Sequence, residues 1–159
     1  MLENIKGLEF FTNQAEPAAI GVVALGAVEA TSNPYGVVST EHLAIHLFED
    51  PIRDALKTET NATYIGGHSN RSKKAPLRIS PAARIVLAEA TTEAHAQGRR
   101  VSPADIKRAL LLQDLESEEN DLGIMQSIGL RAIDLLRQMD EPNVPVLPKR
   151  TAELVGSLR

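Results

Sequence analysis

The sequence contains no cysteine and no tryptophan, and aromatic residues make up only 3% of its 159 residues. Without cysteine the chain has no disulfide, no thiolate metal site and no thiol nucleophile, which fits a reducing compartment. Because large aromatic side chains are scarce, Ala, Leu, Ile and Val must fill the core, and this favours closely packed helices over a sandwich or barrel. We therefore predict an all-α protein located in the cytoplasm.

The sequence also lacks an excess of positive charge and a long apolar run. Its formal net charge is −4, whereas a protein that grips a phosphate backbone usually carries Lys and Arg in excess. The most apolar stretch, from Ala18 to Ala30, is interrupted by Glu29 and is too short to span a bilayer. The first residues mix acidic with apolar side chains and do not resemble a secretory signal. We predict a soluble chain with no nucleic-acid partner and no membrane segment.

What the sequence does contain is a series of amphipathic stretches separated by turn-forming residues. Apolar residues recur at helical spacing, and Ser-Pro pairs at Ser80 and Ser102 supply an N-cap followed by a favourable first helical residue. The stretch from Thr58 to Arg78 has no sustained apolar period and contains a Gly-Gly pair, which predicts a linker. The predicted helices span about 16–31, 40–48, 51–57, 81–97, 103 onward, 122–128 and 130–139.

The two halves of the chain repeat one pattern. An offset of about 64 residues superimposes the stripe of the first predicted helix on the stripe of the fourth, and Val38-Ser39 then matches Val101-Ser102 before the next helix. Neither half can bury its apolar face alone, so we predict one bundle with pseudo-two-fold symmetry. The matching stripes are Ala19, Val22, Val23, Gly26, Glu29 and Ala30 in the first half and Ala83, Val86, Leu87, Ala90, Glu93 and Ala94 in the second.

This pattern predicts a domain organisation in which a double-repeat domain fills the middle of the chain. An N-terminal extension precedes that domain, and a Pro-rich tail or linker follows it. The predicted parts are the extension 1–14, the double domain 15–140 with repeat one 15–57, linker 58–78 and repeat two 79–140, and the tail 141–159.

The segment from Val38 to Leu56, VSTEHLAIHLFEDPIRDAL, resembles the repeat of the Clp ATPase amino-terminal domain family. Similar segments run from Ile79 to Gly98 and from Gly123 to Met139. The resemblance implies two pseudo-symmetric helical repeats packed as one Clp N-terminal-like bundle. It also implies a non-catalytic protein-binding module that receives substrates or adaptors for, or modulates, a Clp-type ATP-dependent unfoldase or protease.

The resemblance further implies where such a module would bind. Some members of the family recognise phosphoarginine through a Glu of a Thr-Glu-His motif in each repeat, so Thr40 and Glu41 are candidate protein- or phosphoarginine-binding residues. Ala104 stands where the second repeat would carry that Glu, and the neighbouring Asp105 is expected on another face of its helix. No P-loop sequence is present to cradle ATP phosphates. We expect no catalytic residue, no metal and no cofactor, and Clp ATPase or protease subunits, adaptors or substrate proteins as partners.

Two alternatives follow from the residues themselves. His42 and His46 lie four apart on one predicted helix, a spacing that can direct two imidazoles at one metal ion and would suit a small metal-dependent hydrolase. The segment VSPADIKRALL, from Val101 to Leu111, resembles a short recognition helix and would suit a helical DNA-binding protein. Elemental analysis separates the first alternative from a binding module, and salt-dependent DNA binding separates the second.

Overall fold

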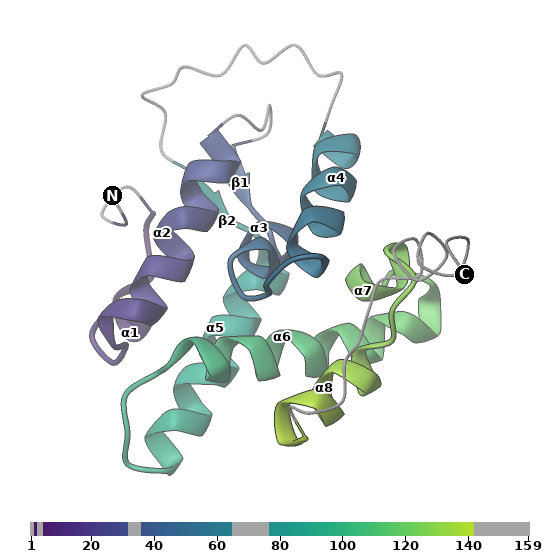
Figure 1. Cartoon of the computed structure of the whole chain (residues 1–159). Coiled ribbons are helices and arrows are strands. Elements are labelled where there is room, and N and C mark those ends of the chain that lie inside the picture. Colours follow the sequence, from purple (N-terminus) through teal and green to yellow (C-terminus); the bar gives the residue numbers. More distant parts are fainter. Residues whose placement is uncertain (1, 3–4, 32–35, 65–76, 142–159) are drawn as a thin grey trace.

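The computed structural model describes residues 2, 5–31, 36–64 and 77–141. Within these ranges the chain forms eight α-helices, one 3₁₀ helix and two very short strands, so the all-α prediction is confirmed (Figure 1). In chain order the elements are α1 (Glu9–Thr12), α2 (Pro17–Thr31), β1 (Val37–Val38), α3 (Thr40–Ile45), α4 (Ile52–Tyr64), β2 (Arg78–Ile79), α5 (Pro81–Ala96), α6 (Pro103–Ser117), η2 (Glu118–Asn120), α7 (Ile124–Ser127) and α8 (Ala132–Asp140).

The first helix of each repeat buries the stripe that the sequence predicts. Small and branched apolar residues at helical spacing fall on one face of α2 and on one face of α5, and both faces turn inward. The residues confirmed as buried are Ala19, Val22, Val23, Gly26 and Ala30 in α2, and Ala83, Val86, Leu87, Ala90 and Ala94 in α5.

The two repeats are joined by reciprocal pairing of short extended segments. Strands β1 and β2 run parallel, with Val38 opposite Ile79. An isolated parallel bridge joins Ala15 to Val101. In both cases the segment before the first helix of one repeat pairs with the segment before the second helix of the other repeat, as a pseudo-two-fold arrangement requires.

The backbone hydrogen bonds follow the same symmetry. The N–H of Ser80 donates to the carbonyl of Val38 at 2.9 Å, and the N–H of Glu16 donates to the carbonyl of Val101 at 2.9 Å. An offset of 64 residues carries Glu16 onto Ser80, and an offset of 63 carries Val38 onto Val101. These matched bonds join the two repeats in one pseudo-symmetric bundle.

Helix α3 is shorter than the sequence predicts. It was expected to continue through Phe48, but it ends at Ile45. The Nε of Arg53, in the first turns of α4, donates to the carbonyls of Ile45 at 3.1 Å and Phe48 at 2.9 Å. Carbonyls at a helix end need partners from elsewhere, and a side chain from the next helix provides them here.

Helix α4 is longer than the sequence predicts. The expected end near Lys57 is wrong, because the helix continues to Tyr64. The hydroxyl of Thr58 donates to the carbonyl of Asp54 at 3.0 Å, and the hydroxyl of Thr63 likewise donates to a carbonyl one turn earlier at 2.9 Å. Threonine hydroxyls can bond within a helix in this way, so a Thr-rich run need not end one.

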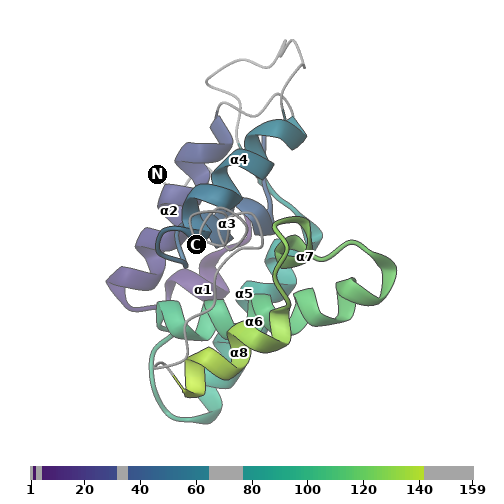
Figure 2. The ribbon, with the colours of Figure 1, turned by 45° about the vertical axis from the view of Figure 1, so that its right-hand side comes forward.

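The N-terminal segment packs against α5, and the last helices pack around α6. Phe11 and Leu8 are buried in the core, and α1 packs against α5. Helix α6 packs against both α5 and α8, and α6 lies beside α8 in both ribbon views (Figures 1 and 2). Residues 65–76 of the predicted linker and 142–159 of the predicted tail lie outside the described residues.

Candidate protein-binding site

The Thr-Glu-His segment begins α3, where the sequence places the first candidate site. Ser39 is the N-cap and is extended, as an N-cap should be. Thr40 is the first residue of the helix and only 9% exposed, whereas Glu41 is half-buried in the first turn. Of the two candidate residues, Glu41 is therefore the more exposed.

His42 completes a capping box with Ser39 and is buried. Its Nδ1 accepts the backbone N–H of Ser39 at 3.0 Å and lies 2.7 Å from the Ser39 hydroxyl. Burial lowers the pKa of His42, although the carboxylates of Glu41 and Glu29 oppose this shift. The ring is thus held neutral, and its Nδ1 is used as an acceptor at the start of α3.

His46 has a different partner, which bears on the metal alternative. Its Nε2 lies 3.5 Å from a carboxylate oxygen of Glu29 on α2, and burial lowers the pKa of His46 while Glu29 opposes that change. His42, in contrast, uses Nδ1 on Ser39. Among the residues that the structure describes, no three His, Cys, Asp or Glu side chains are grouped so that they could hold a metal ion. A metal site formed by His42 and His46 is therefore not favoured.

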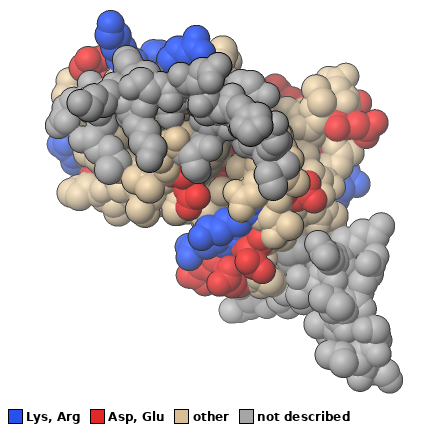
Figure 3. Space-filling model, turned by 90° about the horizontal axis from the view of Figure 1, so that it is seen from above, with Lys and Arg blue, Asp and Glu red and all other residues tan. Residues whose placement is uncertain are grey.

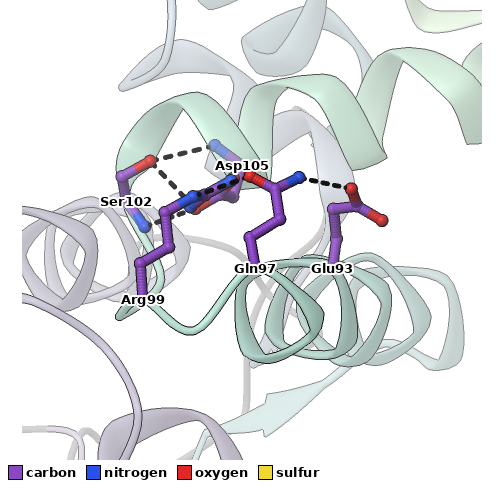
Figure 4. Close-up of polar contacts among 5 residues, drawn as sticks. All are labelled: Glu93, Gln97, Arg99, Ser102 and Asp105. Carbon is purple, nitrogen blue, oxygen red and sulfur yellow. Dashed lines mark hydrogen bonds and ion pairs between the residues drawn. The ribbon is translucent and has the colours of Figure 1, made fainter.

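The corresponding start of α6 uses a carboxylate in place of the histidine. Ser102 is the N-cap, and its backbone N–H donates to Oδ2 of Asp105 at 2.8 Å. Arg99 grips the same carboxylate with both terminal nitrogens, one of them 2.6 Å from Oδ1 (Figure 4). Ala104 is exposed beside it. Asp105 therefore occupies the position of His42, and Ala104 occupies the position of Glu41.

The charge of Asp105 is stabilised by this arrangement. Burial by itself raises the pKa of the carboxyl group, but the hydrogen bonds from Arg99 and Ser102 outweigh it and the pKa is lowered. Arg99 is further oriented by Gln97, whose side-chain oxygen accepts its Nε–H at 3.0 Å, and Gln97 in turn donates to Glu93 at 2.6 Å (Figure 4). Asp105 is a structural residue here. The Ser-x-x-Asp spacing of a capping box was the sequence signal for that role.

An exposed apolar surface on α2 is the feature that the sequence reasoning missed. No charged residue occurs between Pro17 and Val28, so α2 is apolar on its outer face as well as its inner one. Leu25 is 52% exposed and Val28 is 46% exposed. A helix that is apolar all round normally lies in a core, and exposed apolar patches mark interaction sites. The charge-free run itself was the signal that could have found this surface.

A groove between α1 and α2 continues that surface. It has a volume of about 610 Å³, and its walls are mostly aliphatic with Lys6, Glu9 and Thr12 among them. Ile20 and Ala24 line it, and Val28 follows them at the same i, i+4 spacing along α2. We call the groove together with Leu25 and Val28 the α1–α2 surface. The aliphatic residues that line the groove are Leu2, Ile5, Leu8, Ile20 and Ala24.

Charged side chains do not form a broad field on the described part of the face seen from above (Figure 3). On the described part of that face, basic and acidic residues are interspersed over an uncharged background (Figure 3). No helix within the described ranges is long and apolar enough to cross a membrane. Helix α6, the candidate recognition helix, buries Ile106, Ala109 and Leu110 and packs between α5 and α8. The DNA-binding alternative is not favoured by that packing.

The fold matches that of the all-α Clp N-terminal domain. The chain is similar to the crystal structure of the N-terminal domain of the caseinolytic protease associated chaperone ClpD from Arabidopsis thaliana, with a TM-score of 0.59 and 16% sequence identity. The similarity covers 77% of this chain and 90% of that one. No protein-family model and no curated protein sequence matches the chain. The structural likeness establishes the fold.

Proposed function

We propose that this chain is a non-catalytic protein-binding module that receives substrates or adaptors for a Clp-type ATP-dependent unfoldase or protease, or modulates such a machine. The observation that carries the proposal is the fold, which is that of a Clp chaperone N-terminal domain. Fold alone does not specify function, so the proposal also needs a site. The α1–α2 surface supplies one, because it combines a groove with exposed Leu25 and Val28.

The α1–α2 surface is suited to an apolar segment of a client or adaptor polypeptide. Ile20, Ala24 and Val28 form one stripe along α2, and a groove with aliphatic walls and a polar rim is the usual form of a peptide site. Lys6 and Glu9 on the rim offer both signs of charge, which fits many sequences. Binding at this surface would be driven mainly by burial of apolar area.

Thr40 and Glu41 are a second, smaller contact in this proposal. Glu41 can face a cationic group of a bound protein, and Thr40 supports the helix start beneath it. Because Ala104 replaces the matching Glu, phosphoarginine recognition by a pair of sites is not part of the proposal. The absence of turnover and a cytoplasmic location both stay predictions.

The test of this function is binding of a short fluorescein-labelled peptide built from Leu, Phe and Gln, with no charged side chain, measured by fluorescence anisotropy. We expect saturable binding to the native chain and a loss of about tenfold or more in the Leu25→Asp variant, because a buried charge would replace an apolar contact. Leu122→Asp is the matched control, since Leu122 is 75% exposed and lies between η2 and α7. Helix α7 is away from α2 in both ribbon views (Figures 1 and 2). Equal binding by both variants, or none by the native chain, would refute the role of this surface.

A further inference from the structure

A second pocket lies at the start of α6, and its walls carry three arginines. It has a volume of about 440 Å³ and is distinct from the α1–α2 surface. Arg99 and Arg100 come from the loop before α6, and Arg108 comes from the second turn of the helix. Ala104, Glu16 and Met139 complete much of the lining. We call this the α6 pocket.

The three arginines differ in how strongly each is already paired with an acidic residue. Arg99 is committed to Asp105 by two hydrogen bonds. Arg108 pairs with Asp140 at 2.9 Å, but that aspartate is 67% exposed, so the pair is worth little and can exchange partners. Arg99 and Asp105 thus serve the structure, while Arg108 is available to a ligand.

Arg100 is the least committed of the three. Its Nη2 donates only to the backbone carbonyls of Asn13 at 3.3 Å and Ala15 at 3.5 Å. In the described part of the chain no carboxylate lies within ion-pair distance of it. Glu16 is the one carboxylate in the lining besides Asp105, so the lining carries three positive charges and two negative ones.

The first repeat shows that the fold itself does not need these charges. Under the repeat correspondence, Arg99 and Arg100 match Gly36 and Val37, which lead into the same kind of backbone pairing. Arg108 matches Ile45 at the end of α3. Each repeat thus begins its second helix with a serine N-cap, and the positions that carry these arginines in repeat two carry uncharged residues in repeat one.

The residue at the Glu41 position also differs between the repeats, and the difference again makes repeat two more favourable for an anion. Repeat one presents Glu41 in the first turn of its helix, and repeat two presents Ala104 there. A carboxylate at Ala104 would stand among Arg99, Arg100 and Arg108 and would compete with an incoming anion. Its replacement by alanine leaves space beside the amino-terminal end of a 15-residue helix, where negative charge is favoured.

We propose that the α6 pocket binds carboxylates of an acidic segment on a partner protein, with Arg100 and Arg108 as the contacting residues. Arginine binds carboxylates in a planar, bidentate geometry, and Ala104 gives the acidic side chains room to approach. This inference rests on the proposed function, because it names a chemical class of partner for a protein-binding module. The partner then offers an apolar segment to the α1–α2 surface and an acidic segment to the α6 pocket.

The test uses a short fluorescein-labelled peptide of Glu, Asp and Gly, and a peptide with Gln and Asn in place of the acids. At low salt we expect the acidic peptide to bind at least about tenfold more tightly than the neutral one, and to weaken as salt is added. Ala104→Glu should weaken binding by about tenfold or more, and Arg100→Gln and Arg108→Gln by about fivefold each. Arg137→Gln, which changes an exposed arginine outside the pocket, should stay within about twofold.

Three results would overturn the proposal: equal binding of both peptides, equal binding by the native chain and Ala104→Glu, or tighter binding of a short duplex DNA than of the acidic peptide. Because Ala104 is exposed and Glu is favourable in a first helical turn, the Ala104→Glu variant should fold. The uncharged Leu, Phe and Gln peptide is titrated in parallel. If that peptide binds while the acidic peptide does not, this inference fails and the proposed function survives. If the acidic peptide alone binds, the proposed function loses its apolar site.

Discussion

The second helix of repeat one and the second helix of repeat two begin with the same backbone geometry but different chemistry. In α3 the side chain of His42 accepts the N–H of Ser39, and in α6 the carboxylate of Asp105 accepts the N–H of Ser102. In the first case the acceptor is a neutral imidazole, because burial of the His42 ring lowers its pKa. An ionised carboxylate is stable in the second case because Arg99 accompanies it. A duplicated fold can therefore keep a cap while its charge changes.

The two helices also differ in length, and this difference determines what they support. Helix α3 has 6 residues, whereas α6 has 15. The additional turns of α6 carry Asp114, whose carboxylate accepts the backbone N–H groups of Ile124 and Met125 at the start of α7. Glu118 then accepts the N–H of Ala132, the first residue of α8, at 2.7 Å. Repeat two uses Asp114 on α6 and Glu118 at the start of η2 to hold two later helices in place.

The largest expected effect breaks this support. Asp114 is buried, and burial raises the pKa of its carboxyl group although the N–H groups of Ile124 and Met125 oppose the shift. Asp114→Ala leaves those two donors without their acceptor, and we expect the free energy of unfolding to fall by roughly 3 kcal/mol. Urea unfolding followed by circular dichroism measures the change. Glu116→Ala, on an exposed face of the same helix, should cost under about 0.5 kcal/mol, and an equal loss in both variants would contradict the capping role.

A second prediction concerns how closely the helices of each repeat approach. A Cβ added at Gly26 would lie 3.3 Å from both the carbonyl oxygen of His42 and Cδ2 of Leu43, so α2 and α3 meet at a glycine. The matching residue in repeat two is Ala90, which already accommodates a methyl group. Gly26→Leu should destabilise the chain by about 2 kcal/mol through overpacking, and Ala90→Gly by about 1 kcal/mol through helix propensity. Thermal unfolding of both variants tests whether Gly26→Leu is the more destabilising. A Gly26→Leu variant as stable as the native chain would show that α2 and α3 are farther apart.

The pH dependence of the two caps should differ. Burial lowers the pKa of His42 from its ordinary value of 6.5, so the unfolded chain takes up this proton more readily than the folded chain does. The stability that His42 contributes is therefore present above pH 6.5 and is lost as the pH falls below it. Asp105, whose pKa is lowered from 3.8, loses its contribution only below that value. His42→Gln should flatten the stability profile between pH 7 and pH 5, as measured by urea unfolding.

His46 contributes in the same direction, because burial lowers its pKa as well. The effect of His42 is therefore measured in a His46→Gln background as well as in the native chain. His95→Gln serves as the control, since His95 is exposed near the end of α5. A profile that remains steep in the variant lacking both His42 and His46 would assign the pH dependence to another group.

The smallest expected effect is a gain. Beyond the neighbouring backbone of α2 itself, no atom lies within 4 Å of a Cβ built at Gly21, and its match in repeat two is the exposed Ile85. Gly21→Ala should raise the free energy of unfolding by about 0.5–1 kcal/mol, because alanine favours the helix and limits the unfolded chain. Urea unfolding detects this change. A loss of stability would mean that Gly21 has a close neighbour.

The sequence predicted those parts of the fold that depend on local pattern. The stripes of α2 and α5, and the caps at Ser80 and Ser102, follow from helical spacing and from hydroxyl side chains beside helix starts. The end of α3 could not be predicted, because Arg53 reaches back from the next helix to the carbonyls of Ile45 and Phe48. The end of α4 was missed because threonine hydroxyls bond to carbonyls within that helix. The capping role of Asp114 could not be predicted either, because the N–H groups that it accepts lie ten and eleven residues later in the chain.

The candidate site could be predicted only in part. Periodicity distinguishes an inner from an outer face when the two differ, but α2 is apolar on both, so its exposed face gave no contrast. Glu41 was located by the resemblance to the family's Thr-Glu-His motif, and Ala104 by matching the second repeat to the first. Arg100 lies in the loop before α6 and Arg108 lies within the helix, so only the three-dimensional structure shows that both line one pocket.

The role as a protein-binding module is tested most directly by comparing the native chain with Leu25→Asp as baits in lysate from the source organism, with quantitative mass spectrometry as the readout. We predict that a Clp-type ATPase, a Clp protease subunit or one of their adaptors is enriched by the native chain and by Leu122→Asp, and is lost with Leu25→Asp. Enrichment of no Clp component by the native chain, or undiminished enrichment by Leu25→Asp, would contradict the proposed role of the α1–α2 surface.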